Sequence, residues 1–279
     1  MTSAHKFLRF QFAITLSFCL LLFSLQAMGG TRFVVIASTT STENSGFYDH
    51  LLPHFTEETG IEVRVVAVGT GQALRVARNG DADVLLVHHR PSEEQFVADG
   101  FGTRRFDLMY NDYVVVGAGS DPAGTQAAID VADALTRIAS HHSLFYSRGD
   151  DSGTHKKELE LWARTDIKVA DSNGKWYRET GRGMGATLNM ASSMDAYTLS
   201  DRSTWLSFGN KGNLALLFQG DPPMFNQYGI ILVNPEKHPH IRAEEGQAFI
   251  DWMLGEVGQN LINSFQIQGQ QAFFANAAR

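Results

Sequence analysis

Three short segments of the sequence combine hydroxyl side chains with glycine. They are residues 38–42 (STTST), 69–72 (GTGQ) and 147–154 (SRGDDSGT). Hydroxyl and backbone N–H groups donate short hydrogen bonds, and glycine lets a ligand approach the backbone closely. A small oxyanion needs such donors, so these segments indicate anion binding. Their candidate ligand residues are Thr39, Thr40, Ser41, Thr70, Gly71, Ser152, Gly153 and Thr154.

Arg148 is the strong cation within the three segments. Its planar guanidinium matches a tetrahedral oxyanion with two parallel hydrogen bonds. An ion pair with Asp150 or Asp151 is the alternative, and the two roles can coexist. Ser and Thr are also ordinary N-caps, so each segment alone is explained by capping. The occurrence of three such segments in one chain favours a binding site.

The elements around these segments are expected to bring them together. Apolar or β-branched runs predict strands, whereas spaced apolar positions predict helices. Strand and helix alternate, which indicates a parallel α/β sheet in which the loops after the strands meet at one edge. Helix N-termini at that edge carry unpaired N–H groups and a partial positive charge. The expected strands are 32–37, 61–68 and 83–87, and the expected helices are 47–59 and 72–79.

The middle of the chain reads as an insertion between two crossing strands. The strands 113–116 and 230–233 each follow an Asn-containing segment, and helices are expected between them at 130–140 and 156–165. Two amphipathic helices are expected later, at 243–254 and 259–265. We therefore expect two α/β lobes: residues 30–112 plus 230–279 form lobe I, and residues 113–229 form lobe II.

Residues 1–29 read as a cleaved signal peptide. Lys6 and Arg9 precede an apolar run over residues 10–25, and small residues follow it. That run of about 16 residues is shorter than the roughly 20 that a membrane-spanning helix needs. Cleavage after Ala27 or after Gly29 would release the protein into the periplasm. The only cysteine, Cys19, lies in the leader after a bulky Phe18, so we expect no lipid anchor and no disulfide in the mature chain.

The composition restricts the function classes. The chain has 279 residues, a hydrophobic fraction of 43% and a formal net charge of −7. Such a chain can bury a large core, and it lacks the basic surface that nucleic acids or anionic membranes attract. An anion site in an acidic protein must depend on local donors.

Several motifs together resemble the tungstate-binding subunits of ABC transporters. The matching segments occur in the family's order and span essentially all of the mature chain: residues 38–41, 69–73, 83–88, 147–155, 195–199 and 201–202. The resemblance implies a type II periplasmic-binding fold, with two lobes joined by two crossover strands that close over one oxyanion. It also implies a transport receptor without cofactor or catalysis, acting as a monomer with an ABC import permease as its partner.

Carried over by position, the resemblance assigns the ligand donors. They would be Thr39 or Thr40, Ser41, Thr70, Arg148 and Thr154, assisted by the backbone N–H of Ser152 or Gly153. The family's first loop commonly starts with threonine, whereas Ser38 stands here, so a hydroxyl is kept. Tungstate and molybdate have nearly the same size and charge, and the sequence does not rank them.

Phosphate is the main alternative ligand. Phosphate receptors have a similar Arg-x-Asp-x-Ser-Gly-Thr loop, matched here by residues 148–154. Phosphate keeps a proton at neutral pH and benefits from a carboxylate acceptor, whereas a carboxylate repels tungstate. Asp150 or Asp151 inside the pocket would therefore favour phosphate.

Catalysis and metal binding are weaker alternatives. Residues 149–153 (GDDSG) resemble a serine hydrolase segment, and His155 follows Ser152 by three residues. His50 and His54 have helical spacing, but no third ligand stands at a characteristic distance in the sequence. The glycine-rich segment 181–185 (GRGMG) suggests a nucleotide loop, yet no apolar strand precedes it.

Overall fold

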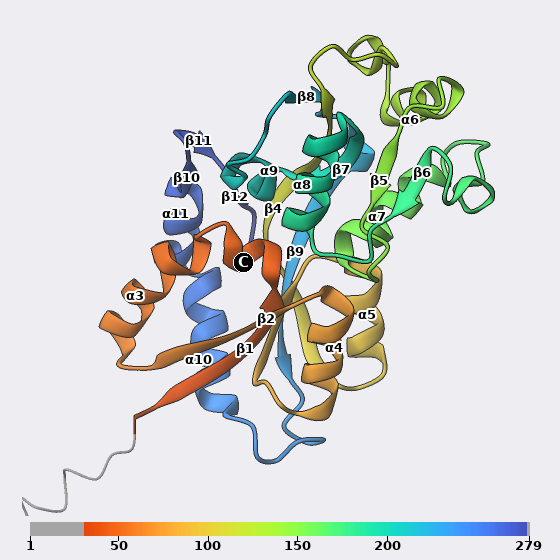
Figure 1. The fold of residues 1–279 in the computed structure, drawn as a ribbon. Helices are drawn as coiled ribbons and strands as arrows, with labels where there is room; N and C mark the ends of the chain where they lie inside the picture. The colour runs from red at the N-terminus through yellow and green to blue at the C-terminus, as the bar shows by residue number, and fades with distance from the viewer. Residues whose placement is uncertain (1–30, 278–279) are drawn as a thin grey trace, which may run out of the picture. The chain divides into compact units, whose positions relative to one another are not determined.

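The computed structural model describes residues 31–277, so the expected leader and Cys19 lie outside the described part (Figure 1). Its main sheet has the strand order β2-β1-β3-β9-β4-β7-β5-β6, and β12 and β8 also pair with β4. Parallel pairs join β1 to β2 and β3, and β5 to β6 and β7. Strands β4 and β9 run antiparallel to their neighbours, so the sheet is mixed, whereas the sequence predicted a parallel one.

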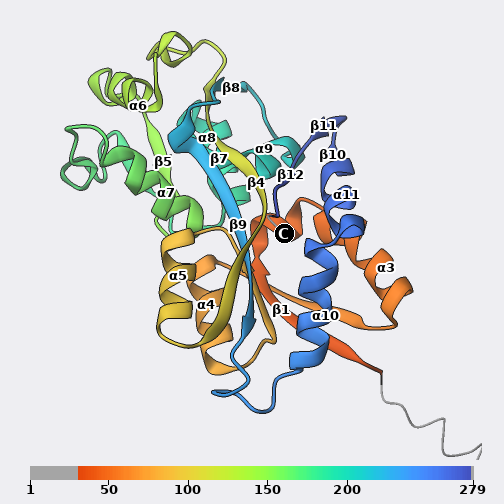
Figure 2. The ribbon, with the colours of Figure 1, turned by 180° about the vertical axis from the view of Figure 1, so that it is seen from behind.

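One half of the sheet is covered by helices on both faces (Figure 2). Helices α3 (Phe47–Thr59), α10 (Ala243–Leu254) and α11 (Glu256–Ser264) pack on one face, and α4 (Thr70–Asn79) and α5 (Arg90–Ala98) pack on the other. All four residues of β3 are therefore buried, as their continuous apolar run predicts. The strands of this half are β1 (Phe33–Thr39), β2 (Glu62–Val68), β3 (Val84–Val87), β9 (Phe225–Val233) and β12 (Phe274–Ala275).

The other half has its own two cores. Helices α6 (Val131–Ser140) and α7 (Gly153–Trp162) contribute to one, and α8 (Met184–Met194) and α9 (Arg202–Ser207) contribute to the other. Its strands are β5 (Phe145–Ser147), β6 (Tyr177–Glu179), β7 (Tyr197–Asp201) and β8 (Leu214–Phe218). The remaining short elements are α2 (Thr40–Asn44), η2 (Thr125–Ala127), η3 (Val169–Ser172), η4 (Pro222–Met224), β10 (Gln266–Ile267) and β11 (Gln270–Gln271).

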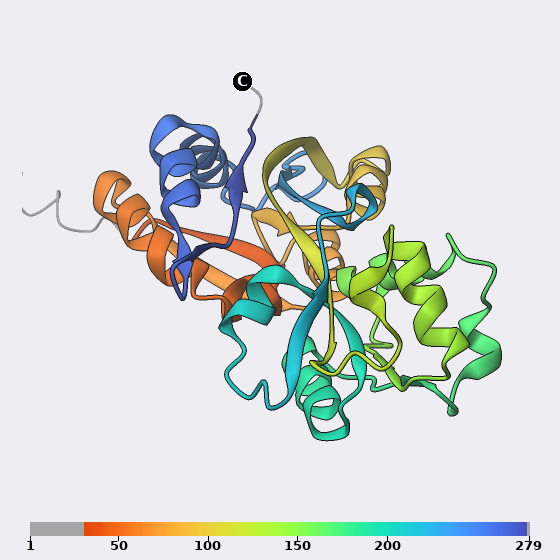
Figure 3. The ribbon, with the colours of Figure 1, turned by 90° about the horizontal axis from the view of Figure 1, so that it is seen from above.

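Strand β4 (Gly102–Ala118) joins the two halves. Its first part, up to Asp112, pairs with β9, and from Tyr113 it pairs with β7. Figure 3 shows β4 and β9 side by side at the centre, between the orange and the green parts of the chain. The fold is thus two-lobed, with two strands crossing between the lobes, as the sequence predicted.

The expected helices fall close to the observed ones, but three of them begin earlier than predicted. Helix α3 has the predicted bounds and is followed by Gly60, whose φ of 70° suits a glycine. Helix α4 begins at Thr70 instead of residue 72, α7 at Gly153 instead of 156, and α11 at Glu256 instead of 259. The added residues of α4 and α7, at 70–71 and 153–155, carry no apolar pattern. The hydroxyls of Thr70 and Thr154 therefore stand within helix N-termini.

Candidate functional site

The three segments predicted from the sequence meet at one cavity of about 290 Å³. Each segment contributes lining residues, and two further lining residues, Arg75 and Gly183, lie outside the three segments. The lining residues are Thr40, Gly69, Gly71, Gln72, Arg75, Arg148, Asp150, Asp151 and Gly183. Thr40, Gly71 and Arg148 are therefore predicted site residues that reach the cavity directly.

The second segment supplies the N-terminus of α4. Its N-cap, Gly69, has no side chain to satisfy the N–H groups of the first turn, so these can donate to an anion. Thr70 is 1% exposed, and its Oγ1 accepts a hydrogen bond of 3.1 Å from the backbone N–H of Gly153. The second and third segments thus touch across 83 positions of sequence.

The third segment supplies Arg148 and the N-terminus of α7. Arg148 is 5% exposed. Its Nε and Nη2 donate to Oδ2 of Asp150, at 3.1 and 2.6 Å, and Nη1 lies 3.5 Å from Oγ1 of Thr154. The ion pair between Arg148 and Asp150, which was the alternative role of Arg148, is therefore present. Nη1 of Arg148 is the guanidinium nitrogen that does not bond to Asp150. Ser152 caps α7, because its Oγ accepts from the backbone N–H of His155.

The first segment is a strand end followed by a short helix. Thr39 caps α2: its Oγ1 accepts from the N–H of Thr42 at 3.4 Å and lies 3.2 Å from Oγ of Ser41. Ser38 donates to the carbonyl of Leu86, so its hydroxyl is used inside the fold. Ser41 lines an adjoining cavity of about 450 Å³, which shares Thr40 and Gly183 with the first one.

Two lining residues were not predicted. Gly183 is the N-cap of α8 and, like Gly69 of α4, provides no side-chain cap. Helix α8 therefore also directs an uncapped N-terminus at the cavity. The glycine-rich segment 181–185 was the available signal. Arg75 lies beyond the second segment on α4, and its Nε and Nη2 donate to Oε1 of Gln72. The helical spacing from Gly71 was the signal that could have identified it.

The formal charges at the cavity balance. Arg75 and Arg148 face Asp150 and Asp151, so the attraction for an anion depends on the helix N-termini and individual donors. His88 lies behind Gly153, and its Nδ1 is 3.0 Å from the hydroxyl of Tyr113. Burial lowers the pKa of His88 to about 4, so its ring is neutral at neutral pH.

The contacts of Ser152 and His155 do not form a nucleophile–base pair. The Ser152 hydroxyl accepts from the backbone of His155, and Nδ1 of His155 accepts from the backbone N–H of Asp151.

Within residues 31–277, no three His, Cys, Asp or Glu side chains are grouped as a metal ion would require. No helix in the same range is long and apolar enough to cross a membrane.

Comparisons with known proteins identify the family of the chain. A family model described as a PBP superfamily domain matches residues 26–257. The chain belongs to this superfamily. It is 48% identical to the tungstate-binding protein TupA of Peptoclostridium acidaminophilum over 88% of this chain and 86% of the relative, so it also belongs to the family of that protein.

Solved structures that are similar to this chain include two tungstate proteins. The tungstate-binding protein TupA of Desulfovibrio alaskensis G20 has a TM-score of 0.78 and 43% identity, covering 88% of this chain and 100% of that one. The tungstate ABC transporter protein of Geobacter sulfurreducens has a TM-score of 0.76 and 47% identity, covering 84% and 98%.

Proposed function

We propose that this PBP superfamily protein is a periplasmic receptor that captures tungstate and delivers it to an ABC import permease. The observation that carries the proposal is the cavity where three predicted segments and Arg148 meet. The uncapped N-termini of α4 and α8 border it, and an oxyanion without protons can accept hydrogen bonds from their N–H groups. The TupA relatives support tungstate as the ligand.

The expected donors differ in how they would act. Thr40, Gly71 and Arg148 line the cavity, so we propose direct contact for them. Thr70, Gly153 and Thr154 bond to each other or to Arg148, so they would hold the segments together and turn toward the ligand on closure. Ser41 would contribute from the adjoining cavity, whereas Thr39 and Ser152 would act mainly as caps.

Closure would occur about the two crossing strands. We propose lobe I as residues 30–112 plus 230–279 and lobe II as residues 113–229. Strand β4 exchanges partners between Asp112 and Tyr113, and the pairing of β9 with β3 begins at Gly229, which support these bounds. The receptor would work as a monomer without covalent chemistry, and the permease would recognise the closed form.

Phosphate is the second candidate ligand, because Asp150 and Asp151 line the cavity. A carboxylate there can accept the proton of a phosphate. The carboxylate of Asp150, however, already accepts from Arg148 and from the backbone N–H of Ser152 at 3.3 Å. Both oxygens of Asp150 are therefore engaged within the protein, and the TupA relatives support tungstate over phosphate.

Calorimetric titration of the purified mature protein tests the proposal. Tungstate, molybdate, sulfate and phosphate would be added separately at constant pH and ionic strength. We expect tungstate to bind at one site per chain, with phosphate far weaker. Preferential phosphate binding, or no binding by any of the four, would contradict the proposal.

A further inference from the structure

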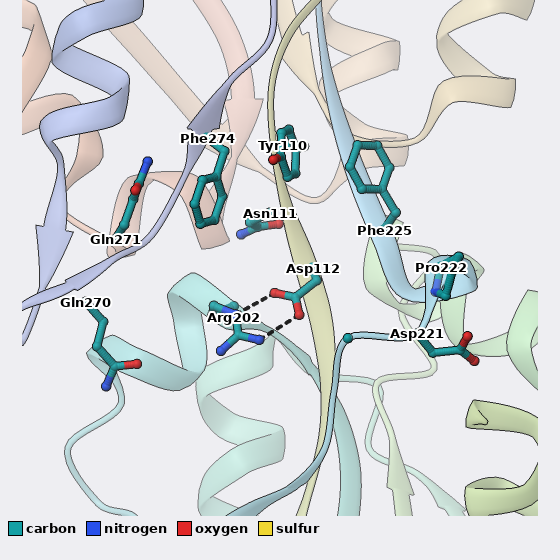
Figure 4. Close-up of a pocket in the computed structure, with 11 residues that line it drawn as sticks. Tyr110, Asn111, Asp112, Arg202, Asp221, Pro222, Phe225, Gln270, Gln271 and Phe274 are labelled. Carbon is teal, nitrogen blue, oxygen red and sulfur yellow. Dashed lines mark hydrogen bonds and ion pairs between the residues drawn. The ribbon is translucent and has the colours of Figure 1, made fainter. Parts of the chain in front are cut away.

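A second cavity, of about 590 Å³, lies beside the crossing strands and shares no lining residue with the oxyanion cavity (Figure 4). Its walls come from β4, α9, the segment before β9, and the C-terminal strands β11 and β12. The lining residues are Tyr110, Asn111, Asp112, Arg202, Gly220, Asp221, Pro222, Phe225, Gln270, Gln271 and Phe274. A volume of this size is typical of sites for small organic molecules.

Three aromatic rings form one wall. Tyr110 lies between Phe274 and Phe225, with ring centroids 5.2 and 4.7 Å apart (Figure 4). Phe225 is 44% exposed, although it belongs to a strand that is otherwise largely buried. The rings lie nearly parallel, with interplanar angles of 20° and 32°, so the wall presents their edges, and a planar aromatic ligand can pack its face against these edges.

One polar group at this cavity has no partner. Asn111 is 1% exposed, and its Oδ1 accepts from Nδ2 of Asn226 at 2.6 Å. Its own Nδ2 is buried and has no hydrogen-bond partner. In Figure 4 this nitrogen points to the side of the cavity where Phe274 lies. A buried donor without a partner is unfavourable, so a ligand with a carbonyl oxygen would satisfy it.

The charged groups at the cavity favour a neutral ligand. Both oxygens of Asp112 accept from Arg202, whose Nη2 also donates to Gln219. Asp221 adds a second carboxylate, which accepts from the backbone N–H of Val131. A further anion would meet this excess of negative charge.

We propose that the cavity binds a small, neutral, planar aromatic molecule that carries a carbonyl group, such as an aromatic amide. The ligand ring packs edge-to-face against the wall of Tyr110, Phe225 and Phe274, and the carbonyl accepts from Asn111. The site is independent of the oxyanion cavity and does not rest on the proposed function.

Saturation-transfer NMR with benzamide as the probe tests this site in the full mature chain. Two matched molecules separate the contribution of the aromatic ring from that of the neutral amide. Cyclohexanecarboxamide has the amide but no aromatic ring, and benzoate has the ring but a charged carboxylate in place of the amide. We expect saturable binding of benzamide and at least threefold weaker binding of both analogues. The absence of a saturable benzamide signal would overturn the proposal.

Two variants locate the binding. Phe225→Ala removes an exposed ring and should weaken benzamide at least threefold, whereas Ile129→Ala, at a residue 89% exposed and outside the cavity, should leave it unchanged. Asn111→Asp keeps the acceptor for Asn226 but removes the free donor, and it should also weaken benzamide. Thermal unfolding of each variant confirms that it is folded. Equal benzamide affinity in wild type and Phe225→Ala would show that the probe binds elsewhere and would overturn the assignment.

Discussion

The backbone N–H of Gly153 donates a hydrogen bond of 3.1 Å to Oγ1 of Thr70. This bond joins the N-termini of α4 and α7, which belong to different halves of the sheet. Because Gly71 of α4 and Asp151, just before α7, line the oxyanion cavity, the contact fixes how closely the second and third segments approach each other.

Gly153→Ala tests that contact. A Cβ at this position would lie 3.0 Å from Oγ1 of Thr70 and 3.1 Å from Cε1 of His88, so the segments would be pushed apart. Overpacking of this kind costs about 1–3 kcal/mol, and we expect a corresponding loss of tungstate affinity. Gly119→Ala is the matched control, because its Cβ would meet nothing closer than 3.5 Å and Gly119 lines neither cavity of the site. Unchanged affinity in Gly153→Ala would show that the contact does not shape the site.

Arg148→Ala should cause the largest loss of affinity. Truncating a buried, charge-paired group at an interface typically loses about 2–5 kcal/mol, part of it from leaving the Asp150 carboxylate uncompensated. Calorimetry against the exposed control Arg164→Ala would measure the effect. If Arg148→Ala bound tungstate as tightly as wild type, the guanidinium would have no role in binding.

Glu158 gives a prediction about pH and stability. Burial raises its pKa to about 8 from an ordinary value of 4.5, although hydrogen bonds such as that from the Tyr177 hydroxyl, at 2.8 Å, oppose the shift. A folded-state pKa above the unfolded one means that the contribution of Glu158 to stability is fully present below about pH 4.5 and is lost as pH rises to about 8.

Glu158→Gln should remove this part of the pH dependence. Denaturant unfolding at several pH values would show a flatter profile between about pH 4.5 and 8, by up to roughly 5 kcal/mol for a shift of this size. Glu160→Gln, at an exposed residue of the same helix, is the control. A wild-type slope retained in Glu158→Gln would show that Glu158 is ionised in the fold.

The signal peptide expected at residues 1–29 can be tested separately. Mass spectrometry of the protein from the periplasmic fraction should find an N-terminus at Met28 or Gly30, as cleavage after Ala27 or Gly29 requires. The mature chain should then fail to react with maleimide, because Cys19 is lost with the leader. An intact N-terminus or a maleimide adduct would show that the leader is retained.

The sequence predicted the lobes and the meeting of three segments because both depend on periodicity and loop position. The crossing strands were recognised only in part. Strand β4 begins at Gly102, and its first half starts with two exposed and three half-buried residues after that glycine, without the apolar run that identified residues 113–116. Pairing with β9 holds this part in place, and pairing is a tertiary effect that local pattern does not contain.

Which hydroxyls and glycines face the cavity was less predictable, because this also depends on tertiary structure. Thr39 and Ser152 carry the expected hydroxyls, yet both are occupied as caps, and only coordinates distinguish a cap from a ligand donor. Gly183 was missed because its segment follows β6, a strand of three residues with two exposed positions. A chemical motif can therefore be read from sequence more easily than the direction in which each donor points.

We infer that one tetrahedral dianion binds in the cavity lined by Thr40, Gly71 and Arg148. Crystals of the mature protein grown with tungstate and measured at the tungsten absorption edge would locate the anion. We expect one strong anomalous peak in this cavity, within hydrogen-bonding reach of Arg148 and the α4 N-terminus. A peak elsewhere, or none at saturating tungstate, would rule out this site.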